Sequence, residues 1–146
     1  MNTHLSALVN EVFEALEAKD KDAVINLFHN ESEFIDPHYP NTHMKGKSEI
    51  IEGLTWSFKG IKAFSFTPVN YFENKHGTHA SVEMATKIEL ENGKKISFRQ
   101  VFVIETNNGK ISRCQAYETY GPHGILKIIL TFTRFINKLR LSKVVI

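Results

Sequence analysis

The residues best suited to chemistry in this 146-residue chain lie in one short segment that contains Asp36, His38 and His43. A carboxylate and imidazoles can move protons near neutral pH, and the same groups can bind a metal ion. Their spacing matches no strong metal-ligand signature, so we predict no metal site. Asp36 stands directly before Pro37, where an aspartate often caps a turn with its side chain. The residues alone leave two interpretations of Asp36 open, a turn cap or a carboxylate of a functional pocket.

The first half of the chain, which must position this segment, is predicted to be mainly helical. Apolar residues recur at three- and four-residue steps over about residues 3–18, which is typical of an amphipathic helix. Asp20 can cap a second, short helix by accepting an N–H from its first turn. A strand over residues 32–36 then leads into the prolines, which stop it. A third helix begins at Gly46 or Ser48.

The second half of the chain is predicted to be an antiparallel sheet. From residue 64 on, apolar residues alternate with a period of two, and glycine-containing pairs interrupt the alternation. An Asn-Gly pair favours a tight hairpin, because both residues tolerate a positive φ. The turn signals are His76-Gly77, Asn92-Gly93 and Asn108-Gly109, and the strands they separate cover about residues 64–75, 78–90, 95–106 and 110–120.

Length and composition indicate one domain with its own core. The single cysteine, Cys114, cannot pair within the chain, which suits a reducing compartment, and we expect an inert thiol in the core or pocket. The first residues lack the pattern of a signal peptide, and no apolar run is long enough to span a membrane. We therefore expect a cytoplasmic protein.

Charge divides the chain into a body over residues 1–124 and a basic extension over residues 125–146. The extension carries five of the 18 Lys and Arg residues and none of the 16 Asp and Glu residues, so the body is slightly acidic. An acidic body argues against nucleic-acid binding. The apolar residues of the extension fall on one side at helical spacing: Ile125, Ile128, Ile129, Phe132, Phe135, Ile136 and Leu139.

Three interpretations of this extension remain open. Its Ile/Phe side packs back over the open end of the domain or against a dimer partner. It lies on an anionic membrane surface as a peripheral contact, since a basic side opposite Ile, Leu and Phe suits the interface. It is partly disordered.

The order of helices and strands resembles the nuclear transport factor 2-like superfamily, over about residues 3–121. Short motifs are similar to its SnoaL-like and ketosteroid isomerase-like branch: Phe34-Ile35-Asp36-Pro37, Gly46, Ile50, Asn108-Gly109-Lys110-Ile111 and Ala116-Tyr117. The resemblance implies an α+β cone, in which N-terminal helices pack inside a strongly curved antiparallel sheet and leave a pocket. To this the present chain adds a C-terminal amphipathic helix.

The resemblance also assigns roles to single positions. In ketosteroid isomerases the Asp before this Pro is the general base, and Asp36 occupies that position here. The two hydrogen-bond donors of the family's oxyanion hole correspond to Val12 and Val101, which cannot donate. The resemblance therefore does not imply the ordinary steroid isomerase mechanism.

If Val101 faces the pocket, strand alternation also turns Arg99 inward. The same alternation on the last strand turns Cys114, Glu118 and Tyr120 inward. Arg99 and Glu118 are alternatively a simple ion pair between neighbouring strands. We assign acid/base or anion-stabilising roles to Asp36, Arg99 and Tyr120. Candidate ligand contacts are His38, Tyr39, Val12, Trp56, Val101, Cys114 and Glu118, with Trp56 alternatively part of the core.

Three functions fit these observations. The first is a cofactor-independent isomerase, cyclase or hydrolase that acts on a small apolar molecule by acid/base chemistry. The second is a non-catalytic carrier of a hydrophobic ligand in the same cone. The third is an interaction module, and the resemblance implies that domains in this role usually pair through the outer sheet face. We expect a homodimer.

Overall fold

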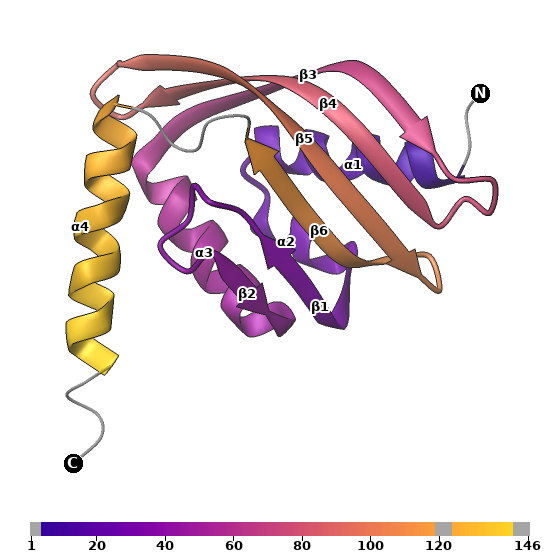
Figure 1. Cartoon of the computed structure of the whole chain (residues 1–146), viewed down its shortest axis with the longest axis horizontal. Helices are drawn as coiled ribbons and strands as arrows, with labels where there is room; N and C mark the ends of the chain where they lie inside the picture. Colours follow the sequence, from indigo (N-terminus) through magenta and orange to yellow (C-terminus); the bar gives the residue numbers. More distant parts are fainter. Residues whose placement is uncertain (1–3, 119–123, 142–146) are drawn as a thin grey trace.

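The computed structural model describes residues 4–118 and 124–141 (Figure 1). Helices dominate the first part and long strands the second part, as predicted. In chain order the elements are α1 (His4–Glu17), α2 (Lys21–Asn26), β1 (Phe28–Ile35), β2 (His43–Lys45), α3 (Gly46–Gly60), β3 (Ile61–Glu73), β4 (His79–Leu90), β5 (Lys95–Asn107), β6 (Lys110–Glu118) and α4 (Gly124–Leu141).

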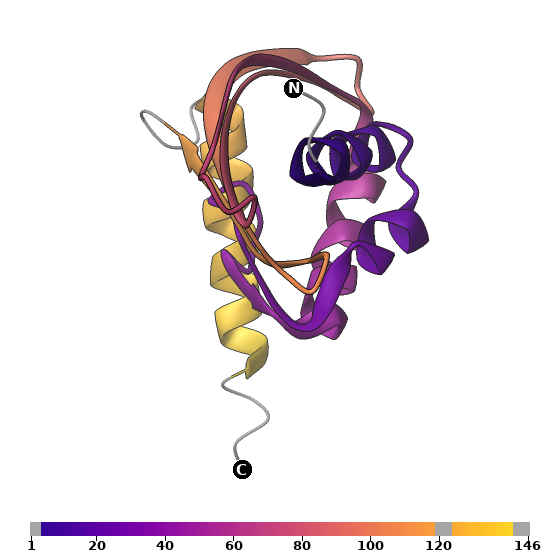
Figure 2. The same ribbon diagram turned by 90° about the vertical axis from the view of Figure 1, so that its right-hand side faces the viewer.

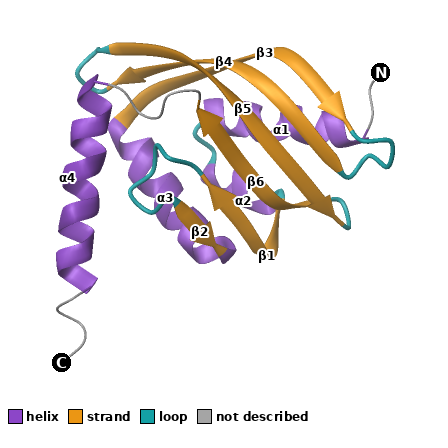
Figure 3. Ribbon diagram, in the orientation of Figure 1, coloured by secondary structure: helices purple, strands orange, loops and turns teal. Residues whose placement is uncertain are grey.

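All six strands form one sheet in the order β2-β1-β6-β5-β4-β3 (Figure 3). The four long strands are sequential antiparallel hairpins, which confirms the prediction. The sheet is nevertheless mixed, because β1 lies parallel to β6, with Phe34 opposite Cys114. Parallel neighbours end at the same edge of a sheet, so the residues after β1 lie close to the end of β6.

The sheet curls around α1, as the turned view shows (Figure 2), and forms the predicted cone. Buried residues of α1 meet buried residues on the inner face of β4 and β5. Phe13, Phe66 and Phe102 form the aromatic centre of this core, with Phe13 and Phe102 centroids 4.9 Å apart. Burial of such rings is the largest favourable contribution to folding, so this trio fixes the helix against the sheet.

Local signals act where they were predicted, with one difference in turn type. Asp20 accepts a hydrogen bond from the backbone N of Ala23 at 2.9 Å and caps α2. Asn108 and Gly109 both have a positive φ, as the tight hairpin turn requires. In the other two connections only Gly77 and Gly93 are in this region, because those loops are longer.

The first strand is longer than its sequence pattern predicts. β1 begins at Phe28, and the backbone N of Ile111 donates to Leu27 O at 2.8 Å. The pairing with β6 therefore begins directly after α2, which ends at Asn26. The short strand β2 was not predicted, since the prolines before it indicated an irregular loop.

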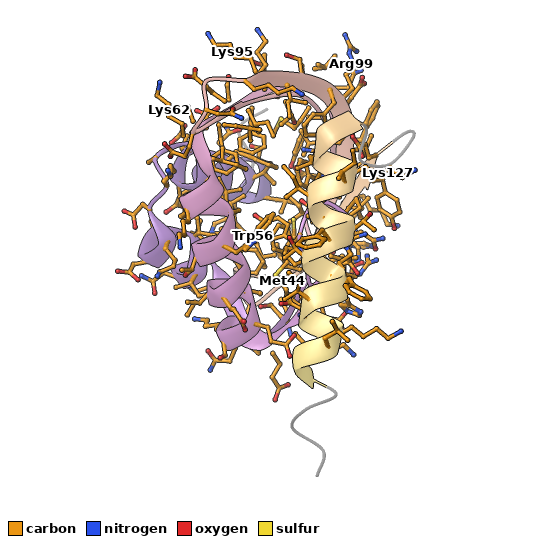
Figure 4. All side chains as sticks on the ribbon, turned by 90° about the vertical axis from the view of Figure 1, so that its left-hand side faces the viewer. Met44, Trp56, Lys62, Lys95, Arg99 and Lys127 are labelled. Carbon is orange, nitrogen blue, oxygen red and sulfur yellow. The ribbon has the colours of Figure 1, made fainter. Side chains whose placement is uncertain are left out.

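Helix α4 runs beside α3 (Figures 1 and 4) and packs through a different side than expected. Leu126 and Leu130 are buried, whereas Phe132 and Phe135 are 65% and 59% exposed. The interpretation in which the Ile/Phe side packs back over the domain was therefore wrong. Packing of that side against a dimer partner stays a prediction. The leucine side fits because Leu126 lies against an apolar cavity. One turn beyond Leu130, Arg134 reaches backbone carbonyls of the domain.

Candidate active site

A mostly apolar cavity of about 70 Å³ lies inside the cone. Every layer of the fold contributes to its wall, including α1, α3, the sheet and α4. The apolar wall consists of Leu16, Phe34, Trp56, Ile61, Phe64, Phe66, Ile88, Phe98, Phe102 and Leu126, and the polar groups are Asp36, His38, Tyr39, Ser57, Thr86 and Gln100. Few polar groups on an apolar wall are typical of a site for a small organic ligand.

Asp36 follows the last residue of β1 and combines both interpretations left open by the sequence. Its Oδ1 accepts the backbone N–H of His38 at 2.8 Å, so the carboxylate caps the turn at Pro37. The side chain is also 8% exposed and lines the cavity. Among the described residues no hydrogen bond reaches its Oδ2. One oxygen therefore fixes the turn, and the other has no partner in the described part of the chain.

His38 lies between two carboxylates. Its Nδ1 is 2.8 Å from Asp36 Oδ1, and its Nε2 is 3.3 Å from Glu118 Oε2. The contact with Glu118 is not aligned for a hydrogen bond. In the described ranges neither His38 Nε2 nor Glu118 Oε2 has a hydrogen-bond partner. The imidazole stacks on Phe98, with ring centroids 4.8 Å apart. This packing fixes the plane of the ring.

Two opposing effects set the pKa of His38. Burial alone lowers the pKa, because it disfavours the charged imidazolium. The hydrogen bond and charge of Asp36, with a smaller contribution from Glu118, outweigh burial and leave the pKa above its ordinary value. His38 is thus a protonated acid over a wider pH range than a free histidine, with its N–H directed at a carboxylate.

A second polar pair lies deeper in the cavity wall and was missed from the sequence. Gln100 is buried on β5, and its Nε2 donates to Thr86 Oγ1 at 3.0 Å. Its Oε1 is buried without a hydrogen-bond partner in residues 4–118 and 124–141. An unpartnered polar atom in an apolar wall is a position where a ligand can donate a hydrogen bond. The inward parity of β5 was the only signal that could have identified Gln100.

That parity was predicted incorrectly. Arg99 and Val101 were expected to face the pocket, but both lie on the outer face of the sheet, where Arg99 Nη1 pairs with Glu83 Oε1 at 2.9 Å. The β5–β6 register shifts between Glu105 and Thr106. The extra residue of this irregularity is on β6, between Ile111 and Arg113, and the alternation along β5 is intact. The wrong parity therefore came from the family correspondence that placed Val101 in the pocket. Arg99 therefore contacts neither the cavity nor Glu118 in this arrangement.

The expected inward face of β6 is present. Cys114 and Ala116 are buried, and the Glu118 side chain is 5% exposed behind His38. Cys114 borders a small void that Val12 also lines, separate from the main cavity. Burial raises the pKa of the Cys114 thiol, which suits an inert core residue. Tyr120, the third predicted acid/base or anion-stabilising residue, lies outside the described residues.

The aromatic candidates Tyr39 and Trp56 both line the cavity. The hydroxyl of Tyr39 accepts a hydrogen bond from Ser57 Oγ at 3.4 Å, and burial raises the pKa of Tyr39. Trp56 is partly buried, lies between α3 and α4 and packs against Tyr39 (Figure 4). It belongs at once to the core and to the cavity wall, so both interpretations from the sequence apply.

His43 is not part of this site. It pairs with Glu33 on the surface at 2.9 Å, so Asp36, His38 and His43 do not converge. The described part of the chain holds no group of three or more histidine, cysteine or acidic side chains placed to bind a metal ion.

Helix α4 completes the site from outside. Leu126 lines the cavity, and Arg134 Nη2 donates to Pro37 O at 2.5 Å and Tyr39 O at 3.3 Å. These carbonyls flank His38 in the turn that Asp36 caps. The helix therefore both borders the cavity and holds the turn that carries Asp36 and His38.

Comparison with known proteins agrees with this architecture. Residues 9–114 match the family profile of the SnoaL-like domain. Among curated proteins none matches the sequence significantly. A Δ5-3-ketosteroid isomerase from Mycobacterium sp. has 15% identity and a TM-score of 0.72 over 80% of this chain and 93% of that chain.

Two further solved structures are similar at the level of the fold. A Mycobacterium tuberculosis protein in complex with estradiol-17β-hemisuccinate has 14% identity and a TM-score of 0.73, covering 82% of this chain and 95% of its own. A proposed polyketide cyclase from Xanthomonas campestris has 15% identity and a TM-score of 0.71, covering 86% and 94%.

Proposed function

Because this chain belongs to the SnoaL-like domain family, we propose that it is a cofactor-independent isomerase, cyclase or hydrolase of a small, mostly apolar molecule. Asp36 and His38 are the proposed acid/base pair. The observation that carries this proposal is their placement on the wall of an apolar cavity, joined by a 2.8 Å contact. A carboxylate with one oxygen engaged and one without a described partner suits proton transfer at a ligand carbon.

The proposed chemistry needs only groups of the chain itself. Asp36 removes a proton from a carbon next to a carbonyl, and the electron pair moves onto the carbonyl oxygen. In an isomerase, protonated Asp36 then returns the proton to another carbon of the same molecule as the electron pair moves back from the oxygen, so nothing is consumed. A hydrolase would consume one water molecule in addition. His38, between its two carboxylates, orients Asp36 and, when protonated, supplies positive charge beside the reaction.

Two of the three residues to which the sequence assigned catalytic or anion-stabilising roles no longer carry the proposal. Arg99 lies on the outer face of the sheet. We therefore propose His38, in place of Arg99, as the anion-stabilising residue. The proposed ligand-anchoring group is Gln100, whose unpartnered Oε1 accepts a hydrogen bond from a hydroxyl or amine of the ligand. Tyr120 lies outside the described residues, so its anion-stabilising role stays a prediction and does not support the proposal.

Hydrogen–deuterium exchange at carbon tests the proton transfer without knowledge of the natural substrate. A panel of small cyclic ketones is incubated with the full chain in D₂O, and deuterium incorporation is followed by mass spectrometry. We expect Asp36→Asn to slow exchange by about 10²–10⁴-fold, the usual contribution of a positioned acid or base.

The matched control is Asp22→Asn, the same chemical change on the exposed side of α2. It should leave exchange unchanged. Equal exchange by wild type and Asp36→Asn, with both proteins folded by circular dichroism, would refute the proposal.

A second function, carriage of a hydrophobic ligand, is favoured by the composition of the cavity wall. Aromatic and aliphatic groups dominate the wall. Of its polar groups, Gln100 is hydrogen-bonded to Thr86, and Ser57 is hydrogen-bonded to Tyr39. The similar Mycobacterium tuberculosis structure holds a steroid ester. Native mass spectrometry and the exchange assay together distinguish the functions. A carrier should retain its ligand in the Asp36→Asn variant, and neither wild type nor this variant should exchange hydrogen of the ligand.

The proposed homodimer has its own support on the outer face of the sheet. Val101 and Tyr117 are paired across β5 and β6, and they are 36% and 48% exposed. Apolar side chains paired on an exposed sheet face suit an interface between copies. Tyr117→Glu should shift the mass measured by light scattering from dimer to monomer, and a wild-type monomer would remove this proposal.

A further inference from the structure

Helix α4 presents a continuous apolar surface to solvent. We define its outer face as Ile128, Ile129, Phe132, Phe135 and Leu139, which are between 42% and 68% exposed. A helix advances by about 100° per residue, so these five side chains share one side of α4. Single exposed apolar residues are ordinary, but a cluster of this size on one helix marks an interaction surface.

The opposite side of the same helix is already occupied. Leu126 and Leu130 are buried, and Arg134 binds the turn at Pro37 and Tyr39. The domain holds α4 through Leu126, Leu130 and Arg134. The outer face is therefore not needed to pack the helix against the core. Within residues 4–118 and 124–141, Ile128, Ile129, Phe132 and Phe135 stay exposed to solvent, so the occupant proposed for the outer face lies outside the described residues.

Charge identifies the kind of partner. Residues 125–146 contain five basic residues and no acidic one. Lys127 is exposed and projects from the side of α4 turned away from α3 (Figure 4). By helix geometry Lys127 and Lys138 lie along one edge of the outer face. An apolar face with a basic edge is typical of a helix that lies in the interface of an anionic bilayer.

The length and composition of α4 agree with lying on a membrane. Within the described ranges no helix is long and apolar enough to cross one. A second copy of the chain is less favourable, because α4 against α4 brings two acid-free basic segments together. We propose that the outer face of α4 binds the surface of a membrane that contains anionic phospholipid. This inference does not depend on the proposed acid/base activity.

Vesicle sedimentation of the full chain tests it. Wild type is mixed with phosphatidylcholine vesicles and with vesicles of phosphatidylcholine and phosphatidylserine. We expect binding to the second kind, at least about tenfold weaker binding to the first, and release at high salt. The variant Phe132→Glu/Phe135→Glu should lose at least about tenfold in affinity, since burial of one ring alone has about that effect.

Phe72→Glu is the matched control, because Phe72 is 68% exposed on β3 and Phe132 is 65% exposed on α4. It should bind like wild type after allowance for one charge. Equal losses from Phe72→Glu and the helix variant would overturn the proposal, as would equal binding to both kinds of vesicle.

Light scattering of the same proteins tests whether a second copy of the chain, and not a membrane, covers the outer face. If the wild type binds neither vesicle and the helix variant reduces its oligomer size, then a second copy covers the outer face and the proposal is wrong. Asp36→Asn should sediment like wild type, so failure of the catalytic proposal leaves this result unchanged.

Discussion

Two carboxylate–histidine pairs near the end of β1 have almost the same geometry and different surroundings. Asp36 and His38 approach to 2.8 Å, and Glu33 and His43 approach to 2.9 Å. The side chains of the first pair are 8% and 13% exposed, and those of the second are 39% and 42% exposed. Only the first pair has Glu118 and Phe98 against its imidazole. Contact distance therefore does not distinguish the cavity pair from the surface pair, but burial and neighbours do.

The largest expected difference between the pairs is in stability. His38→Ala leaves Asp36 and Glu118 buried without the cation between them, so we expect a loss of about 3 kcal/mol in the free energy of unfolding. His43→Ala should cost less than about 0.5 kcal/mol, because an exposed pair contributes little. Urea unfolding of both variants measures this, and equal losses would show that burial does not separate the pairs.

The next difference is in pH dependence. The folded-state pKa of His38 is above its ordinary value of 6.5, mainly because burial is outweighed by the hydrogen bond and charge of Asp36. The stabilisation is fully present below pH 6.5 and is lost as the pH rises through the higher folded-state pKa. Urea unfolding at a series of pH values should show this decline in wild type. The decline should be absent in His38→Gln, and its persistence there would assign it to another group.

A smaller effect separates the two carboxylates that flank His38. Asp36→Asn and Glu118→Gln should both lower the pKa of His38 measured by NMR titration. The Asp36 substitution should lower it more, since Asp36 makes the aligned hydrogen bond and Glu118 makes only a charge contact. A larger shift from Glu118→Gln would reverse the assignment of the main partner.

The smallest effect belongs to the surface pair. The hydrogen bond and charge of His43 lower the pKa of Glu33 at an exposed site that salt screens. Glu33→Gln should change the melting temperature by no more than about two degrees at low salt, because an exposed ion pair contributes little to stability. The difference from wild type should shrink as salt is added. A difference that grows with salt would contradict a screened ion pair.

Local signals in the sequence were sufficient for most of the fold. The Asp20 cap, the Asn108-Gly109 turn and the Asp36-Pro37 break each depend on residues a few positions apart, and each appears where it was predicted. The parallel pairing of β1 with β6 joins distant parts of the chain, and no local pattern encodes it. It was therefore the main feature of the sheet that was missed.

The same distinction explains the errors at the site. Asp36 was found because its position is defined by the adjacent proline, whereas Gln100 was missed and Arg99 and Val101 were misplaced. Their direction follows the apolar alternation along β5, from Ile96 to Ile104, which the family correspondence at Val101 overrode. On α4, the sequence shows the larger apolar side, but the side that packs is decided by the cavity beside Leu126.

The bond from Arg134 to Pro37 joins residues 97 positions apart. Contacts between such distant residues form late in folding, because the intervening chain must be ordered before they become favourable. The turn that carries Asp36 and His38 can therefore adopt its backbone shape early, through local hydrogen bonds, and gain its last restraint only when α4 docks. In refolding, native-like circular dichroism should return before the environment of His38 is complete, so we expect the scaffold to assemble first and the Asp36–His38 turn to be fixed last.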